Sequence, residues 1–447
     1  MTRTIRILFL AAALILPAPG AHSALFPFQG DEVGLTPPDE EASRKEVLDQ
    51  IEENKEEAAK LKAEFVDQLG VDESEYSCCI SDHVVLLAKV EEEQAVQLTQ
   101  IAEYVYRRLN WITFGKTEAD TFKPAGGKHH YYMVDKDSYE DLLVWLSEKF
   151  PRTLTKQLVR YYLKIADKVG GASLALAHPP MHFNKGRNRS SAAANGMGHH
   201  WLAWNTRSAL REINIRTGKP MGRGRDRQDL LSWLHEGVGI WASLDAIGLN
   251  NYFRITQTRY SNVGRAKKGG DSDYVALAYE LATGQIGRKD GAKNFYQLTR
   301  ADLNQLSDLD LAMSWSIVDY LLRSRTKEWR DLIKRCNRVP SFRIAMVGAF
   351  GTKQEKDELK VLLKKTKNQN RLDELYRMVC ERFEKGWKAW VAEHYRGQYE
   401  DPTKTDREPP FTPIETAVSE DGNDEGGGEE KPKKKKKKKK KRRRRRR

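Results

Sequence analysis

The sequence has 447 residues, with 77 lysines and arginines, 63 aspartates and glutamates, and a formal net charge of +14. Sixteen of the positive charges lie in residues 431–447, so the rest of the chain has a net charge of −2, which is 14 less 16. The excess of positive charge therefore lies in this end of the chain. A domain specialised for binding nucleic acid is expected to be basic as a whole, and these numbers argue against such a domain here.

Residues 1–23 have the pattern of an export signal. Arg3 and Arg6 form a basic start, residues 7–16 are apolar, and Ala21-His22-Ser23 provides a site of the kind that signal peptidase cleaves. The apolar run has about ten residues, fewer than the roughly 20 that a membrane-spanning helix needs. We therefore expect an exported protein (periplasmic, envelope-associated or extracellular) without a transmembrane segment after cleavage. A retained N-terminal anchor is the alternative.

The next segments predict a linker at 24–39 and a charged amphipathic helix at 40–70. The helix has few apolar residues, spaced three to four apart, which gives one narrow apolar stripe: Leu48, Ile51, Ala58, Leu61, Phe65 and Leu69. We expect this stripe to pack on the folded domain; pairing with another helix is the alternative.

Residues 77–397 have the hydrophobic patterning of a globular domain. Its first part predicts strands and helices: a strand at 82–90, a helix near 91–112, a strand, turn and helix across 128–150, and short strands in 170–183. The later part predicts helices at 190–212, 226–247, 273–284, 299–324, 327–337, 354–365 and 370–396. This order predicts an α+β fold with a small N-terminal mixed sheet and a mostly helical C-terminal half.

The end of the chain, 398–447, is rich in Pro, Gly and Glu and then becomes polybasic, so we expect it to be disordered. The basic run has no aromatic residues for stacking on bases, which argues against specific nucleic-acid recognition. It predicts nonspecific, salt-sensitive contact with polyanions or acidic envelope polymers. Alternatively, the basic run contacts the acidic segment 420–430 of the same chain. Representative basic residues are Lys433, Lys437, Lys441, Arg442 and Arg447.

The chain has only four cysteines, too few for a disulfide scaffold, and no C-x-x-C pair that would indicate a thiolate metal site. Two states stay open for them. Cys78 or Cys79 could form a bridge with Cys336 or Cys380, or all four could be free thiols.

The segment "SWLHEGVGIWAS" (232–243) begins like the H-E-x-x-H motif of zinc peptidases. That motif places two imidazoles one helical turn apart. Here His235 and Glu236 start the pattern, but Gly239 stands where the second histidine belongs.

The same segment resembles a different motif, W-L-x-E-G-x-A-x-[YW] of the peptidase-MA-like gluzincins, in residues 233–241. The resemblance implies a zincin-like domain across 77–397, with Glu236 as the third zinc ligand. It places the H-E-x-x-H helix upstream, on "NGMGH" (195–199). His199 then matches the second ligand, Asn195 the first ligand, and Gly196 the glutamate that acts as general base.

The resemblance therefore implies a degenerate site, in which no catalytic residue is left at position 196. We expect an inactive peptidase-like protein that acts as a binding or structural module of the cell envelope, with an unknown protein or envelope polymer as partner. One alternative is an active zinc peptidase that uses His199 and Glu236 with an unorthodox third ligand. A second is a polyanion-binding protein acting through its tail. Candidates for the unorthodox ligand are His178, His182, His200 and His235.

Overall fold

The fold is described from a computed structural model, which describes residues 40–115, 127–165, 171–186, 188–209, 231–250, 271–301, 303–404 and 408–414. The chain divides into two units, 1–414 and 415–447. The predicted signal peptide, the linker and the polybasic residues lie outside the described residues.

A five-stranded mixed sheet forms the N-terminal part of the fold. Its order is β1-β2-β3-β5-β4, with parallel pairing from β2 through β3 to β5 and antiparallel strands at both edges. The strands are β1 (Ser77–Ile80), β2 (Val84–Ala88), β3 (His129–Met133), β4 (Gly171–Leu174) and β5 (Met181–Asn184).

Alternate residues of the central strands face opposite sides, as the period of a β-strand requires. Leu86 and Tyr131 are register partners in the core shared with α3 (Glu92–Phe114) and α6 (Arg189–Thr206). Leu87 and Tyr132, one residue further on, belong to the core shared with α4 (Tyr139–Lys149). Both faces of the sheet are therefore covered, so β2 is buried along its whole length.

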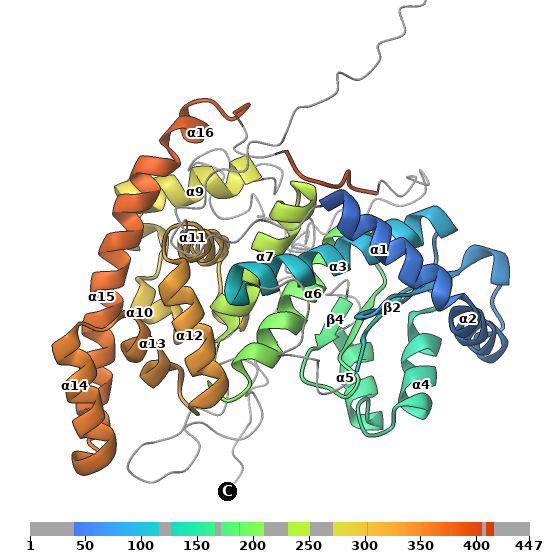
Figure 1. Cartoon of the computed structure of the whole chain (residues 1–447), viewed down its shortest axis with the longest axis horizontal. Coiled ribbons are helices and arrows are strands. Elements are labelled where there is room, and N and C mark those ends of the chain that lie inside the picture. The colour runs from blue at the N-terminus through green and yellow to red at the C-terminus, as the bar shows by residue number, and fades with distance from the viewer. Residues whose placement is uncertain are drawn as a thin grey trace, which may run out of the picture. The chain divides into compact units, whose positions relative to one another are not determined.

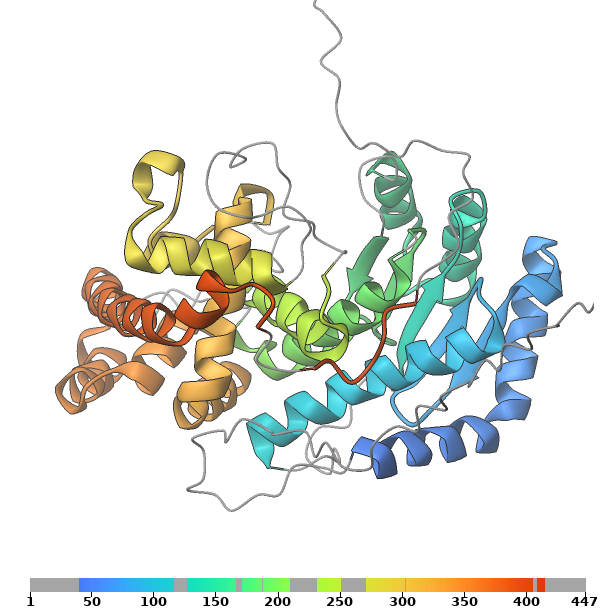
Figure 2. The ribbon, with the colours of Figure 1, turned by 90° about the horizontal axis from the view of Figure 1, so that it is seen from above.

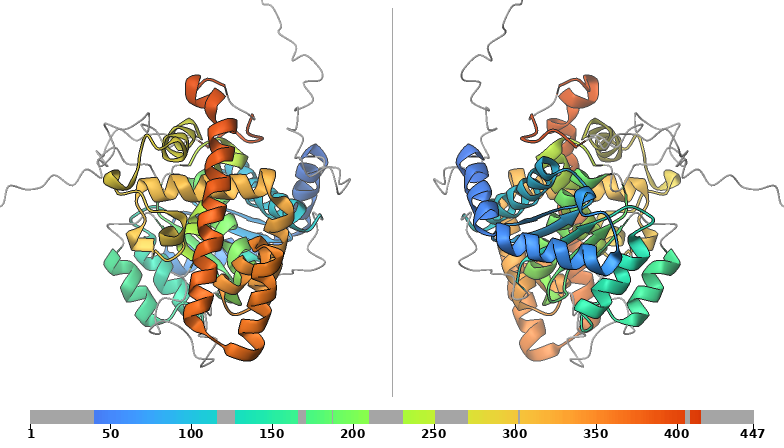
Figure 3. Two further views of the ribbon diagram at one scale, coloured as in Figure 1. Left: turned by 90° about the vertical axis from the view of Figure 1, so that its left-hand side faces the viewer. Right: turned by 90° about the vertical axis from the view of Figure 1, so that its right-hand side faces the viewer.

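The chain after β5 forms helices, among which α6 and α7 lie next to the sheet half (Figure 1). Helix α7 contacts α6 on one side and α11 on the other, and α15 packs along α9, α10, α11 and α13 (Figure 3). Among the described helices that follow are α7 (Ser232–Ile247), α9 (Asp271–Thr283), α11 (Asp308–Ser324), α12 (Thr326–Arg338), α13 (Phe342–Phe350), α14 (Lys353–Val361) and α15 (Gln369–His394). The described residues also form α5 (Lys156–Ile165), before β4, and the four- and five-residue helices α10 (Phe295–Leu298) and α16 (Arg396–Glu400). The predicted α+β class, with a small N-terminal mixed sheet and a mostly helical C-terminal half, is confirmed.

The charged segment predicted as one helix forms two, α1 (Glu40–Glu53) and α2 (Lys55–Leu69). Both pack on the domain. Phe65 is fully buried between the rings of Tyr76 and Trp145, with centroids 5.1 Å and 5.3 Å away. Arg107 of α3 donates to Glu46 of α1 at 2.7 Å.

The predicted boundary at 397 is too early, because the packed chain continues to residue 414. Helix α16 follows α15, and an extended segment at 408–414 runs beside α7 and α3 (Figure 2). We call residues 408–414 the strap. The Phe411 amide donates to the Ala246 carbonyl at 3.1 Å, and the Ile414 amide donates to Ser190 Oγ at 2.9 Å. Composition alone missed the strap because Phe411 buries its ring although its neighbours are polar or proline.

We expect Phe411→Ala to lower the free energy of unfolding by about 3 kcal/mol, the usual cost of truncating a buried aromatic side chain. The ring is only 5% exposed, contacts Tyr104, and lies under the Arg44 guanidinium. Urea unfolding would measure the change. The control is Lys404→Ala, at an exposed site between α16 and the strap, which should change the free energy of unfolding by less than about 0.5 kcal/mol. A loss below about 1 kcal/mol for Phe411→Ala would show that the strap contributes little to stability.

The structure also bears on the cysteines and on membrane-spanning helices. All four cysteines are free thiols, so the disulfide alternative is not realised. Within the described ranges, no helix combines the length and apolar character needed to cross a membrane.

Candidate functional site

Helices α6 and α7 approach each other closely because glycines meet at their crossing. A Cβ atom on Gly198 would lie 3.1 Å from the Gly239 Cα atom and 3.1 Å from the Val238 carbonyl oxygen. A Cβ atom on Gly239 would lie 2.6 Å from Asn195 Nδ2 and 2.9 Å from His199 Nε2. The side chains of Asn195 and His199 therefore lie against the backbone of α7, on the same face of α6.

Glu236 completes this group from α7. Its Oε2 atom lies 3.6 Å from His199 Nε2, and the two side chains are 5% and 16% exposed. The structure thus brings together the three residues that the sequence placed at ligand positions. Asn195 is completely buried.

Several polar atoms of this group have no hydrogen-bond partner among the described residues: Nδ2 and Oδ1 of Asn195, Oε2 of Glu236, and Nε2 of His235. The ring of His235 stacks on that of His199, with centroids 5.8 Å apart. Burial, with a smaller effect from the charge of His199, lowers the pKa of His235 to about 3, so this imidazole is neutral at physiological pH. Buried polar groups are normally satisfied, and an unsatisfied group calls for an explanation such as water, an ion or a ligand.

At Gly196, a side chain would be directed away from α7 and toward the sheet. A Cβ atom there would lie 3.0 Å from His182 Nδ1 and 3.0 Å from Tyr131 Cε1. Tyr131 and His182 are register partners on β3 and β5, and both are buried. The face of α6 that carries the general-base position is therefore packed against aromatic side chains.

The other candidate histidines lie elsewhere. His200 points to the sheet, where its Nδ1 lies 3.1 Å from His129 Nδ1 and its Nε2 lies 2.8 Å from Ser173 Oγ. Burial lowers the pKa of His129 to about 3 and that of His200 well below its ordinary value. His178 packs its ring against Trp204, 5.2 Å away. Neither His178 nor His200 has a described contact with Glu236.

The residues present fit a catalytic zinc site only in part. Two ligand atoms held at about 2.0–2.2 Å by one tetrahedral zinc ion lie about 3.4 Å apart, which matches the 3.6 Å between His199 and Glu236. The third position is an amide, Asn195, and an amide is a poor zinc ligand. In the described part of the chain, no three His, Cys, Asp or Glu side chains form a group that could hold a metal ion. Asn195, His199 and Glu236 by themselves therefore supply two suitable zinc ligands, not the three of a catalytic zinc centre.

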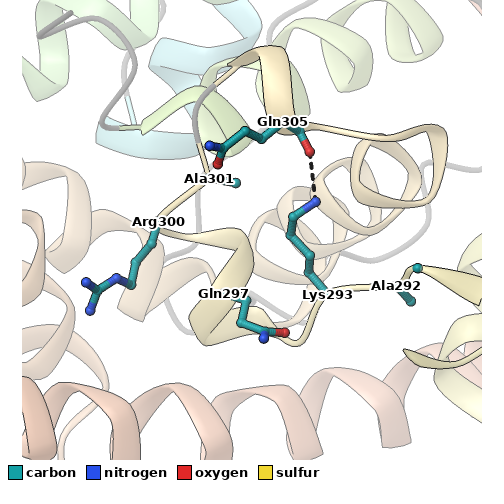
Figure 4. A pocket seen from close by; sticks show the side chains of 7 residues that line it. Ala292, Lys293, Gln297, Arg300, Ala301 and Gln305 are labelled. Atoms are coloured by element: carbon teal, nitrogen blue, oxygen red, sulfur yellow. Dashed lines mark hydrogen bonds between the residues drawn. The ribbon is translucent and has the colours of Figure 1, made fainter. Parts of the chain in front are cut away.

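A separate surface hollow of about 340 Å³ lies beside α10 (Figure 4). Its Lys293 donates to the Gln305 carbonyl at 2.8 Å and pairs with Asp310. Arg300 donates to Tyr296 at 2.6 Å. Its cationic side chains thus have partners within the chain, and none of the candidate site residues lines the hollow.

Sequence reasoning missed the role of the sheet in this site. His182 was a candidate metal ligand, but the structure places it behind α6 with Tyr131. A signal was available: His182 lies in the buried "MHFN" strand, and alternation along it separates His182 from Met181 and Phe183.

No protein-family model matches the sequence, and the search of curated proteins finds no match.

Proposed function

We propose that the protein is an exported, peptidase-like domain that has lost hydrolysis and acts as a binding or structural module of the cell envelope. The observation that carries the proposal is the residue at the general-base position, Gly196, whose open side is filled by His182 and Tyr131. A positioned general base contributes roughly 10²- to 10⁴-fold to the rate of such reactions. Glycine has no side chain that could hold or deprotonate water.

The retained half of the site supports the gluzincin resemblance. His199 and Glu236, which match the second and third ligand positions, lie 3.6 Å apart in a buried setting. A protein that only binds a partner needs the fold to be preserved but does not need peptide hydrolysis. The alternative, an active zinc peptidase, needs a third ligand. His200 is engaged by the sheet, His182 faces Gly196, and His178 lies against Trp204, which leaves His235, stacked on His199, as the candidate ligand. The inactive protein is still favoured, because position 196 has no side chain that could act as general base.

The decisive experiment measures zinc per chain and cleavage of a denatured protein substrate by the full-length protein. We expect no stoichiometric zinc and no cleavage that a chelator abolishes. Glu236→Ala and the nearly isosteric Glu236→Gln are the matched variants. The active peptidase would be established instead if the wild type binds one zinc per chain and shows chelator-sensitive cleavage, and both variants lose the zinc and the cleavage.

A second candidate function rests on the 16 positive charges of residues 431–447. These charges would bind anionic lipids or polymers in a salt-dependent manner whether or not the domain has a partner. Deleting 431–447 separates the two ideas, because only the tail hypothesis expects all envelope binding to disappear with the deletion.

A further inference from the structure

We propose that His182, supported by Tyr131, is a plug that closes the space in which a general-base side chain on α6 would lie. The inference rests on the proposed function, since it takes the domain as an inactivated peptidase-like fold. It goes further in one respect. It assigns to a residue of the sheet the role of keeping the site closed, so that restoring the lost motif on α6 would not be sufficient to rebuild it.

The plug is part of a row of side chains that crosses the sheet under α6. The register pairs Leu86 with Tyr131, Tyr131 with His182, and His182 with Ser173. Register partners on neighbouring strands point to the same face of a sheet. His182 is 1% exposed, Tyr131 is 0% exposed, and their ring centroids lie 5.7 Å apart.

The distances at Gly196 show how little space this row leaves. Even the first atom of a side chain there would lie 3.0 Å from both His182 Nδ1 and Tyr131 Cε1, closer than nine in ten real Cβ contacts. A glutamate would have to place four more heavy atoms beyond that point. Protein interiors are close-packed, so those atoms need the space that the imidazole ring now fills.

Replacing His182 by alanine removes the imidazole ring beside Gly196 and leaves Tyr131 in place. The ring and the carboxylate-bearing part of a glutamate side chain are similar in size, and volume-conserving exchanges are the ones that cores tolerate. The two positions should therefore be energetically coupled, although they are far apart in the sequence.

A double-mutant cycle on the full-length protein tests this coupling through the thermal unfolding midpoint. The four proteins are wild type, Gly196→Glu, His182→Ala and the double variant. We expect Gly196→Glu to lower the midpoint strongly in the wild-type background and only weakly in the His182→Ala background. If Gly196→Glu gives no folded protein, Gly196→Ala completes the same cycle with the smaller side chain.

Gly198→Ala is the matched control, because it adds a methyl group to the same helix on a face that meets α7. Its Cβ atom would lie 3.1 Å from Gly239 Cα and 3.2 Å from Ala242 Cβ. Its effect on the midpoint should be the same with and without His182. An equal cost of the Gly196 substitution in both backgrounds would overturn the plug.

Zinc content gives a second readout that does not depend on activity. Positions 195, 199 and 236 would hold the zinc and position 196 would not, so Asn195→His alone is the control and should bind zinc equally with and without His182→Ala. Adding Gly196→Glu restores the H-E-x-x-H pattern, but its side chain pushes α6 away from His182, so we expect this variant to bind zinc only when His182→Ala is added. Equal zinc binding by this variant without His182→Ala would overturn the plug. Zinc and cleavage in the wild type would instead contradict the proposed function, so the two failures are distinguishable.

Discussion

Gly237→Ala is expected to destabilise the protein by about 2 kcal/mol or more, although alanine is the better helix former. Alanine in place of glycine gains about 1 kcal/mol in an unstrained helix. At Gly237, however, a Cβ atom would lie 2.6 Å from the Ser314 carbonyl oxygen and 2.9 Å from Val318 Cγ2. The first of these neighbours is backbone of α11, so relief requires two packed helices to separate, and overpacking of this kind costs typically 1–3 kcal/mol, occasionally more.

Gly397→Ala is the matched control for this experiment. It lies in α16, has no heavy atom within 4 Å of an added Cβ, and should keep the helical gain. Urea unfolding of both variants decides the matter. If Gly237→Ala is as stable as wild type, then α7 and α11 are not in the close contact described.

Acidification is expected to destabilise the fold steeply between about pH 6.5 and pH 4. Burial lowers the folded-state pKa of His129 to about 3, of His182 to about 3, and of His130 to about 4, from ordinary values near 6.5. A lowered histidine pKa means that the folded state favours the neutral form. The resulting stability is complete above pH 6.5 and is lost as the pH falls toward the folded pKa values.

The size of this effect follows from the number of groups. Each histidine that is protonated in the unfolded chain and neutral in the folded one contributes about 1.4 kcal/mol per pH unit. His200 and His235 have lowered pKa values as well, so the five buried histidines together give up to about 7 kcal/mol per pH unit. Urea midpoints measured from pH 7 to pH 4 test it. His130→Asn removes one of the five titrating groups and should reduce the slope by about a fifth. A stability that is constant between pH 7 and pH 5 would contradict the prediction.

At still lower pH, protonation of the Glu103 carboxylate also lowers the stability of the fold. The pKa of the buried Glu103 is lowered to about 2, because hydrogen bonds and charge from His83, with Ser81 and Arg107, outweigh the opposing effect of its burial. A lowered carboxyl pKa gives stability that is present above about pH 4.5 and is lost as the pH falls toward 2. The loss of stability should therefore continue below pH 4, where Glu103 adds to the histidines whose folded pKa is about 3.

Local sequence patterns predicted most of the elements because their signals are local. The strand and the helix predicted across 128–150 recur as β3 and α4. The failures were boundaries and short elements. The helix expected from 299 begins only at Asp308, where Ser307 forms a capping box, and α5 and α13 were not predicted. The split of the charged helix at Asn54 was likewise not foreseen.

The sequence by itself determined the concentration of basic charge in residues 431–447, the α+β class, and the pairing of "NGMGH" with "WLHEG" that leads to His199 and Glu236. The first two follow from composition and periodicity, and the third from the resemblance of two short motifs to the gluzincins; all three are properties of short stretches of chain. Only the tertiary structure decided what surrounds Gly196 and Gly239. Those neighbours come from β3, β5 and α6, and close packing of distant segments has no signature in the sequence around either glycine. The same reason explains why His182, four residues after His178, belongs to the sheet and faces Gly196, while His178 lies against Trp204.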